Sequence, residues 1–327
     1  HAGAYRLSVV LDLIKTGDIS LVRGNQSEIK AIYDALSPNT QADISTTGKG
    51  VDGGQIEDSA VITYRLARLI NCPVVATGEE DYVSDGTRVF AVPHGHPIMT
   101  AVTGTGCLLG AVLAAFFSAY YPCKNRLSIG EFLAYALAYY GLAGESAVQV
   151  SGVKPGSFSV AFMDSLYTLN DAVLISENRI RPVVVPDQLQ VYFISGTQDV
   201  ELNENRLLSI VEDACRGGVT CFQFREKGAG TLVGQQKLEL AQQLQQICAK
   251  YNVLYVINDD VDLALAVNAD GVHVGQEDMH LEAVRNLVGH KVVGISIHSV
   301  KELHKTDVIY ADCVGVGPMY ATSSKPD

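Results

Sequence analysis

Short apolar runs and longer amphipathic ones alternate along the first half of the chain. The runs at residues 19–22 and 73–76 predict buried strands, and the helical spacing of apolar positions at 56–69 predicts an amphipathic helix. Residues 82–92 carry the turn sequence SDGT between two apolar stretches, a pattern typical of a β-hairpin. This half of the chain therefore mixes helices with strands.

The second half repeats one pattern, in which a short apolar strand is followed by a helical stretch. This alternation is typical of a parallel sheet, and its spacing suits a TIM-type βα barrel. Six strands of the usual eight are expected, at residues 191–195, 220–225, 253–258, 271–274, 292–297 and 313–317. We therefore predict an α/β chain with one domain at 1–170, a linker at 171–187 and a partial barrel domain at 188–327.

Composition narrows the classes of function. The 327 residues are 47% apolar, which excludes a disordered chain, and 36 acidic against 24 basic side chains give a net charge of −12. Because a phosphate backbone needs a basic partner surface, the acid excess excludes a nucleic-acid binder. Any anionic ligand must then be held by a few well-placed cations.

The sequence indicates neither a secreted protein nor a membrane protein. Seven cysteines, an odd number without a CxxC pair, indicate reduced thiols rather than disulfides or a zinc site. The opening residues HAGAYRLSVV lack the basic and apolar regions of a signal peptide. The apolar helices expected at 107–121 and 132–144 are too short to cross a membrane. We therefore expect a cytoplasmic protein without a membrane partner.

The strongest local motif is VTGTGCLL at residues 102–109. Gly104 and Gly106 allow a tight turn at a helix start and expose backbone N–H groups to an anion. Cys107 falls in the first helical turn, where the helix dipole favours a thiolate. Such a thiolate could take a proton from an attacking hydroxyl while the amides stabilise a phosphoryl group in transfer. The alternative is a helix-capping loop followed by a buried cysteine.

Two further segments offer ligands for phosphate and metal. In VRGNQSEI, Arg23 leaves a strand where it can meet phosphate, and Asn25 and Glu28 are spaced to share a helix face suited to a hydrated magnesium ion. The alternative for this pair is a helix N-cap with a capping-box glutamate. Thr77, in ATGEEDYV, ends a strand, where open α/β sheets bind ligands.

These motifs, together with HGHPIMTAVTGTGCLLGAV and PGSFSVAFMDSLYTL, resemble the hydroxyethylthiazole kinase family, which has a ribokinase-like fold. The resemblance covers residues 1–168 and implies a partial domain, because the family's opening segment has no counterpart here. It also implies ATP as co-substrate with Mg²⁺. The resemblance implies Cys107 as the catalytic base, and Gly104 and Gly106 as the anion hole. It also implies that Arg23 and Thr77 contact ATP, and that Asn25 and Glu28 form the metal and phosphate region.

Polar residues also follow the predicted strands of the second half. In FQFREKG, Gln223, Arg225 and Lys227 fall on one side if the strand continues. Two cations beside an amide suit a diphosphate and a polar ring. The alternative is a solvated strand end.

Two carboxylates end neighbouring predicted strands. Asn258 and Asp259 in INDDVDLAL, and Asp278 in DGVHVGQEDM, fall where barrel enzymes place catalytic groups. Asp259 and Asp278 could jointly hold one magnesium ion, with waters and diphosphate oxygens completing its shell. Two later strand ends carry further polar residues: Ser296, Thr322, Ser324 and Lys325.

These segments and GVGPMYATSSK resemble the thiamine phosphate synthase family, a βα barrel, over residues 188–327. The resemblance implies contacts to an aminopyrimidine, to its diphosphate, to magnesium and to a thiazole phosphate. Gln223 and Asn258 would contact the aminopyrimidine, and Asp259 and Asp278 would bind magnesium. Thr322 and Ser324 would contact the thiazole phosphate. The residues implied for the diphosphate are Arg225, Lys227, Ser296 and Lys325.

The two resemblances together imply a bifunctional transferase of thiamine biosynthesis. The first half would phosphorylate 4-methyl-5-(2-hydroxyethyl)thiazole with ATP. The second half would join the thiazole phosphate to hydroxymethylpyrimidine diphosphate and release pyrophosphate. The implied partners are these small molecules and further copies of the chain in a homo-oligomer. Two alternatives stay open: a non-catalytic module that binds phosphates or thiamine precursors, and a chain that retains only one of the two activities.

Overall fold

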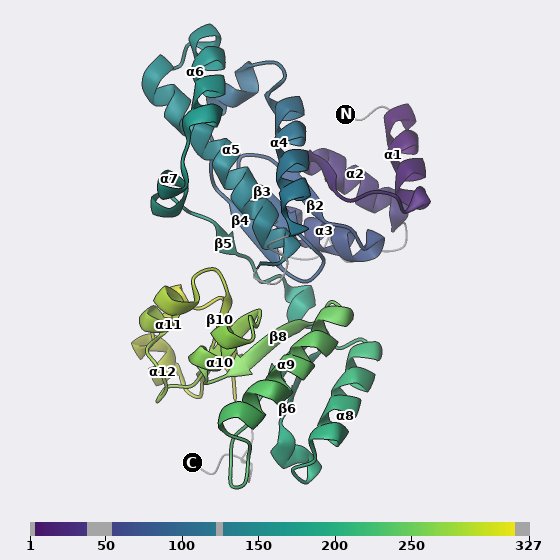
Figure 1. The fold of residues 1–327 in the computed structure, drawn as a ribbon, viewed down its shortest axis with the longest axis vertical. Coiled ribbons are helices and arrows are strands. Elements are labelled where there is room, and N and C mark those ends of the chain that lie inside the picture. The colour runs from purple at the N-terminus through teal and green to yellow at the C-terminus, as the bar shows by residue number, and fades with distance from the viewer. Residues whose placement is uncertain (1–3, 38–53, 122–126, 318–327) are drawn as a thin grey trace. The chain divides into compact units, whose positions relative to one another are not determined.

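The computed structural model describes residues 4–37, 54–121 and 127–317 and divides into two compact units, His1–Val183 and Val184–Asp327 (Figure 1). The first unit contains a five-stranded sheet and the second a six-stranded sheet. Both sheets are packed against helices, so the α/β class predicted from the sequence is confirmed. No helix in the described ranges is long and apolar enough to span a membrane.

The sheet of the first unit is mixed. Its order is β1 (Val22–Asn25), β2 (Val74–Thr77), β3 (Asp81–Ser84), β4 (Val89–Val92) and β5 (Arg181–Pro182). β1 and β2 are parallel and the other neighbours are antiparallel, so the predicted hairpin is confirmed as β3 and β4.

The strand predicted at 19–22 is wrong by three residues. Pairing with β2 begins at Val22, which lies beside Val74, and continues to Asn25, which lies beside Thr77. Only the last residue of the apolar run joins the ladder, because a ladder is made by backbone groups and also accepts polar residues. The polar residues Arg23 and Asn25 therefore belong to the strand end itself.

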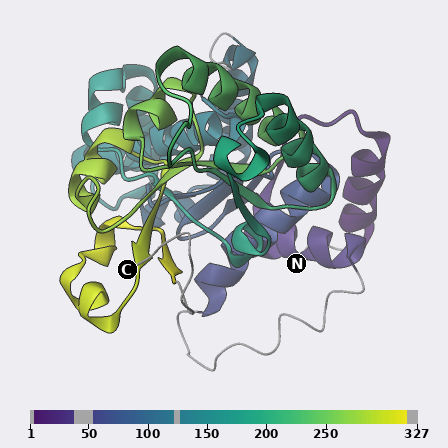
Figure 2. The same ribbon diagram turned by 90° about the horizontal axis from the view of Figure 1, so that it is seen from below.

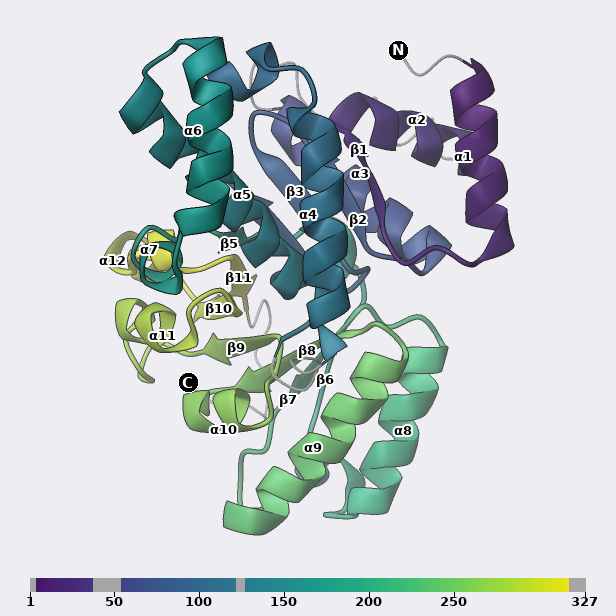
Figure 3. The ribbon, with the colours of Figure 1, turned by 45° about the horizontal axis from the view of Figure 1, so that its top comes forward.

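α5 (Ile129–Ser151) is the central helix of the first unit. It packs against β3 and β4, and α4 (Thr105–Ala119) and α6 (Pro155–Thr168) pack against it (Figure 3). Its glycines permit close approach: a β-carbon at Gly141 would lie 2.5 Å from the His94 Cβ. The apolar helix predicted at 132–144 is thus confirmed inside α5, and the one predicted at 107–121 is confirmed as far as Ala119, where α4 ends. The other helices are α1 (Ala4–Thr16), α2 (Gln26–Leu36), α3 (Gly54–Ile70), α7 (Asp171–Ser176) and a 3₁₀ turn, η1 (Pro97–Ala101).

The second unit is a parallel sheet whose strands follow one another in chain order. A helix lies in each connection, as the βα-barrel prediction requires, and all six predicted strands are confirmed. The strands are β6 (Tyr192–Ser195), β7 (Cys221–Phe224), β8 (Leu254–Asn258), β9 (Gly271–Val274), β10 (Val292–Ile297) and β11 (Cys313–Val316). The helices are α8 (Glu204–Arg216), α9 (Gly234–Lys250), α10 (Val261–Ala266), α11 (Leu281–Val288) and α12 (Val300–Lys305), with a 3₁₀ turn, η4 (Thr197–Val200), before α8.

Alternate residues of these strands face the helices. Phe222 and Phe224 join Leu240 of α9 in the hydrophobic core, and Figure 2 shows the helices of this unit gathered along one side of its strands. Gln223 and His273 fall on the opposite face by the same alternation. The sheet therefore has one face that packs against helices and one that carries polar side chains beside a small apolar cluster, which includes Leu254 and Val256.

Candidate active sites

The residues that join β1 to α2 form a complete helix cap. The Asn25 side chain accepts the Glu28 N–H at 2.9 Å, and Glu28 Oε2 accepts the Asn25 N–H at 2.8 Å. This is the capping-box alternative that the spacing allowed, and it satisfies backbone donors that a helix start leaves unpaired. Both side chains are exposed at the end of β1, so they stay available to solvent and ligands from there.

Arg23 connects the end of β1 with the start of α4. Its Nη2 lies 3.3 Å from the place that a β-carbon on Gly106 would occupy. Its Nε is buried and has no hydrogen-bond partner. The structure therefore brings together two residues that the sequence assigned separately to phosphate, and a glycine at position 106 makes room for the guanidinium.

The first turn of α4 is held from outside and left uncapped. Gly104 has a left-handed φ of +97°, and no side chain caps the N–H groups of this turn. The Thr105 hydroxyl donates to the Met99 carbonyl at 2.8 Å, and the Tyr140 hydroxyl donates to the Thr105 carbonyl at 2.6 Å. Cys107 is exposed here, so the alternative of a buried cysteine is wrong. The arrangement offers free amides and an accessible thiol side by side.

The loop after β2 is anchored by a residue that the motif analysis missed. The Thr77 hydroxyl donates to the Gly24 carbonyl at 3.3 Å, and Asp81 Oδ1 accepts the Gly78 N–H at 2.9 Å. Burial raises the pKa of Asp81 to about 7, although the positive charge of Arg23 acts against that rise. Asp81 thus lies within electrostatic reach of Arg23. The sequence signal was an aspartate at a strand start directly after a strand-end turn.

In the second unit, β7 ends one residue earlier than predicted, at Phe224. Gln223 is buried and donates to the Tyr192 hydroxyl at 3.0 Å. Arg225 and Lys227 lie beyond the strand, so strand alternation does not place them on its face. Lys227 is largely exposed, yet its Nζ lies 2.8 Å from Asp259 Oδ2. The alternative of a solvated strand end therefore agrees with the exposure of Lys227, but it does not account for the ion pair with Asp259.

Asp259 follows β8 in a left-handed conformation, with φ of +62°, that is uncommon for a residue other than glycine. Its N–H donates to the His273 carbonyl at 2.8 Å, which fixes it beside the end of β9. Burial raises the pKa of Asp259, and the nearby Asp278 carboxylate adds to that rise while Lys227 opposes it. Asp278 Oδ2 in turn accepts the Gly275 N–H at 2.7 Å. The two predicted metal ligands therefore lie together.

Ser296 and Asn258 lie on either side of His273. Ser296 Oγ is 2.9 Å from His273 Nε2, and Asn258 pairs with His273 across β8 and β9. A β-carbon at Gly294 would lie 2.4 Å from His273 Nδ1, so the buried imidazole requires a glycine beside it. Three further predicted residues, Thr322, Ser324 and Lys325, lie outside the described residues.

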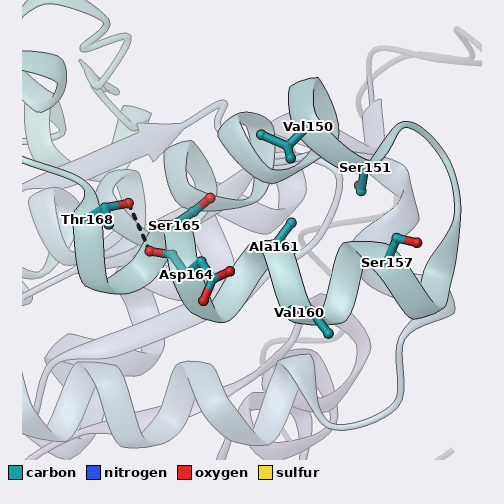
Figure 4. Close-up of a pocket in the computed structure, with 8 residues that line it drawn as sticks. All are labelled: Val150, Ser151, Ser157, Val160, Ala161, Asp164, Ser165 and Thr168. Carbon is teal, nitrogen blue, oxygen red and sulfur yellow. Dashed lines mark hydrogen bonds between the residues drawn. The ribbon is translucent and has the colours of Figure 1, made fainter.

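One groove of the first unit lies elsewhere, between α5 and α6 (Figure 4). The Thr168 hydroxyl donates to the Asp164 carbonyl there at 2.8 Å. None of the site residues predicted above lines this groove. Its lining residues are Val150, Ser151, Ser157, Val160, Ala161, Asp164, Ser165 and Thr168.

Known protein families match the two halves in the same order. The family model described as "Hydroxyethylthiazole kinase family" matches residues 1–172, and the one described as "Thiamine monophosphate synthase" matches residues 191–327. The "Thiamine biosynthesis bifunctional protein ThiM/ThiE" of Symbiobacterium thermophilum is 35% identical over 331 residues. That alignment covers 98% of this chain and 64% of the relative.

Two further proteins match one half each. "Thiamine-phosphate synthase 1" of Streptococcus pneumoniae is 49% identical over 139 residues, which are 42% of this chain and 66% of that protein. The solved hydroxyethylthiazole kinase protein of Pyrococcus horikoshii is 32% identical, with a TM-score of 0.46, over 56% of this chain and 62% of that chain. The chain thus spans 64% and 66% of the two curated relatives. By its first 172 residues it belongs to the hydroxyethylthiazole kinase family, and its residues 191–327 match the model of the thiamine monophosphate synthase family.

Proposed function

We propose that the chain catalyses two consecutive transfers in thiamine biosynthesis. The first half phosphorylates the hydroxyethyl group of the thiazole with ATP, and the second half joins the thiazole phosphate to hydroxymethylpyrimidine diphosphate. One observation carries the proposal: in each unit, cations and polar groups from distant parts of the sequence meet at a predicted phosphate position. In the first unit the Arg23 guanidinium lies close to Gly106, and in the second unit Lys227 forms an ion pair with Asp259.

In the kinase reaction, Cys107 accepts the proton of the substrate hydroxyl. The hydroxyl oxygen then forms a bond to the γ-phosphorus of ATP as the bond to the β-γ bridging oxygen breaks, and ADP leaves. The free amides of the α4 start and the Arg23 guanidinium stabilise the negative charge on the phosphoryl group in transfer. Thr77 and Arg23 contact ATP, and Gly104 and Gly106 form the anion hole.

A magnesium ion bound with ATP would neutralise phosphate charge. Asn25 and Glu28 are the residues we assign to the metal and phosphate region. Their capping box uses the single side-chain oxygen of Asn25 and Oε2 of Glu28, so Glu28 Oε1 takes no part in it, and both side chains are exposed at the strand end. The residues present thus fit a hydrated metal ion that is held mainly by phosphate oxygens and water.

In the synthase reaction, the bond between the pyrimidine methylene carbon and the diphosphate oxygen breaks, and its electron pair leaves with pyrophosphate. The thiazole nitrogen then donates its electron pair to the methylene carbon. Catalysis by the chain is mainly electrostatic stabilisation and positioning. The cations and the hydroxyl that hold diphosphate are Arg225, Lys227, Lys325 and Ser296. The pyrimidine contacts are Gln223 and Asn258, and the thiazole phosphate contacts are Thr322 and Ser324.

The Asp259 and Asp278 pair fits a magnesium ion. Burial and the nearby Asp278 carboxylate raise the pKa of Asp259, and two carboxylates held together at two strand ends favour a divalent cation between them. In the described part of the chain no group of three or more His, Cys, Asp or Glu side chains forms a metal site, so water and diphosphate oxygens would complete the shell. Bound there, magnesium would stabilise the departing pyrophosphate.

We further assign residues 1–170 to the kinase, 171–187 to a linker and 188–327 to the synthase, although α7 and β5 of this linker pack on the first unit. The acid excess favours small-molecule substrates over nucleic acid. We propose a cytoplasmic homo-oligomer.

Separate assays test the two halves. The kinase half predicts transfer of label from [γ-³²P]ATP to the thiazole alcohol, and Cys107→Ala should lose that transfer while it retains ATP binding. The synthase half predicts pyrophosphate release when thiazole phosphate and the pyrimidine diphosphate are supplied directly. Binding of all substrates without either product would favour the non-catalytic alternative. One product without the other would assign activity to a single half.

A further inference from the structure

Glu226 stands between the two predicted diphosphate cations in the sequence, but its own contacts lie with another segment. Its Oε2 accepts the Thr197 N–H at 2.9 Å. Its Oε1 accepts the Thr197 hydroxyl and also the Leu232 N–H, the latter at 2.9 Å. Thr197 is fully buried at the start of η4, and Leu232 lies just before α9. One half-buried carboxylate therefore joins three points of the unit.

The same segment after β6 also holds the backbone of Arg225. The Arg225 N–H donates to the Ser195 carbonyl at 3.0 Å, and the Gln198 side chain donates to the Arg225 carbonyl at 2.7 Å. A β-carbon at Gly196 would lie 2.0 Å from that carbonyl oxygen, so the two backbones are in contact. Residues 225 and 226 are thus clamped through both peptide groups of Arg225 and through the Glu226 carboxylate.

This clamp bears on the two cations because their side chains are long and flexible. The Lys227 side chain is 57% exposed and is held at its tip by the ion pair with Asp259, and Arg225 is half-buried. The position of the charged groups then depends on the backbone from which the side chains start. A shift of about 1 Å in a group that stabilises a transition state can cost about a hundredfold in rate. Holding Glu226 in place therefore also restrains the backbone of its neighbours Arg225 and Lys227, from which the two charged side chains extend.

We propose that Glu226 is a positioning residue for the synthase reaction, which holds the backbone between Arg225 and Lys227 so that both cations reach the diphosphate. This inference rests on the proposed synthase function. Three donors converge on its two oxygens, so the role needs a carboxylate. A glutamine at this position offers one oxygen and one NH₂ group, and at least one of the three donors would lose its acceptor.

The test uses the full chain and measures Mg²⁺-pyrophosphate affinity by calorimetry together with pyrophosphate release. The variants are Glu226→Gln, Thr197→Val, which removes only the hydroxyl donor, and Lys227→Ala. Glu239→Gln is the matched control, because Glu239 is exposed on α9 and its carboxylate accepts a hydrogen bond from the Gln235 side chain of the same helix. We expect Glu226→Gln to lower both the pyrophosphate affinity and the rate of pyrophosphate release by about tenfold or more. Thr197→Val should lower both quantities less, and Glu239→Gln should leave both unchanged.

The Lys227→Ala background separates positioning from general stability. If Glu226 acts through Lys227, Glu226→Gln should add much less to the loss in that background than in the wild-type chain. Equal losses in both backgrounds, or wild-type affinity in a folded Glu226→Gln variant, would overturn the inference. If Glu226→Gln does not fold, Thr197→Val must show the same dependence on Lys227, and full additivity there would overturn it. A wild-type chain that neither binds nor releases pyrophosphate would instead refute the proposed function, and this inference with it.

Discussion

The Arg23 guanidinium lies over Gly106, with Nη2 3.3 Å from the place that a β-carbon of residue 106 would occupy. Gly106→Ala should therefore push the guanidinium away by a few tenths of an ångström. The same change replaces a glycine inside α4, which favours the folded state by about 0.5–1 kcal/mol. We expect weaker ATP binding together with unchanged or higher thermal stability.

Gly110→Ala is the matched control, because nothing lies within 4 Å of a β-carbon at that position of the same helix. It should gain similar stability and keep wild-type ATP affinity. Equal ATP affinity in both alanine variants, measured by calorimetry, would show that Arg23 does not need the space at Gly106.

Gly294→Ala should destabilise the second unit. The new methyl group would meet His273 Nδ1 at 2.4 Å and Cys313 Sγ at 3.2 Å, both inside the sheet. Overpacking of this kind costs about 1–3 kcal/mol in the free energy of unfolding. Combining Gly294→Ala with His273→Ala should cost less than the sum of the two single changes in urea unfolding. Strict additivity would contradict the contact.

His94 should make the first unit less stable as the solution is acidified. Burial lowers the pKa of His94 from its ordinary value of 6.5, the positive charge of Arg179 lowers it further, and Glu145 opposes the shift. Its Nε2 accepts the Arg179 N–H at 3.1 Å, which a protonated ring cannot do. Below pH 6.5 the unfolded state binds more protons than the folded one. The contribution of His94 is therefore present above that pH and is lost as the pH falls toward the lowered value.

Urea unfolding at pH 7.5 and 5.5 measures this effect, with His94→Gln as the comparison. Glutamine keeps an acceptor for the Arg179 N–H and does not titrate. The wild-type chain should lose more unfolding free energy between the two pH values than the variant. The same loss in both proteins would remove His94 from the pH dependence.

Cys107 should be the cysteine most open to alkylation within the described residues. Cys107 is exposed, whereas Cys313 is half-buried. The buried cysteines are Cys72, Cys215, Cys221 and Cys248. If the start of α4 binds phosphate, MgATP should slow the labelling of Cys107 by iodoacetamide, as measured by peptide mass spectrometry. Labelling at the same rate with and without MgATP would place the nucleotide elsewhere.

Much of the fold follows from local pattern, and the sites follow only in part. The six strands of the second unit were predictable because each is a short apolar run between helical stretches. The sequence motif predicts Arg23 as a phosphate ligand, but the contact of Arg23 with Gly106 depends on how β1 and α4 meet, which no local pattern contains. The side of Lys227 was argued from a strand that in fact ends at Phe224. Its pairing with Asp259 arises from adjacent strand ends.

Asp81 and Glu226 were missed for a related reason. Each is an acidic residue in a charged segment, EED or REK, where an exposed side chain is the usual expectation. Burial raises the pKa of Asp81. The three donors around the Glu226 carboxylate come from residues 197 and 232. Such roles are set by tertiary contacts, which one sequence does not reveal.

The central claim of the proposed function is that one chain carries two separate sites that act in sequence, one for phosphoryl transfer to the thiazole alcohol and one for displacement of pyrophosphate by the thiazole phosphate. The most direct measurement is formation of thiamine phosphate from thiazole alcohol, MgATP and pyrimidine diphosphate. Cys107→Ala should abolish it, and added thiazole phosphate should restore it. Asp259→Asn should abolish it with either thiazole substrate. Failure of thiazole phosphate to rescue Cys107→Ala, or full product formation by Asp259→Asn, would contradict the account.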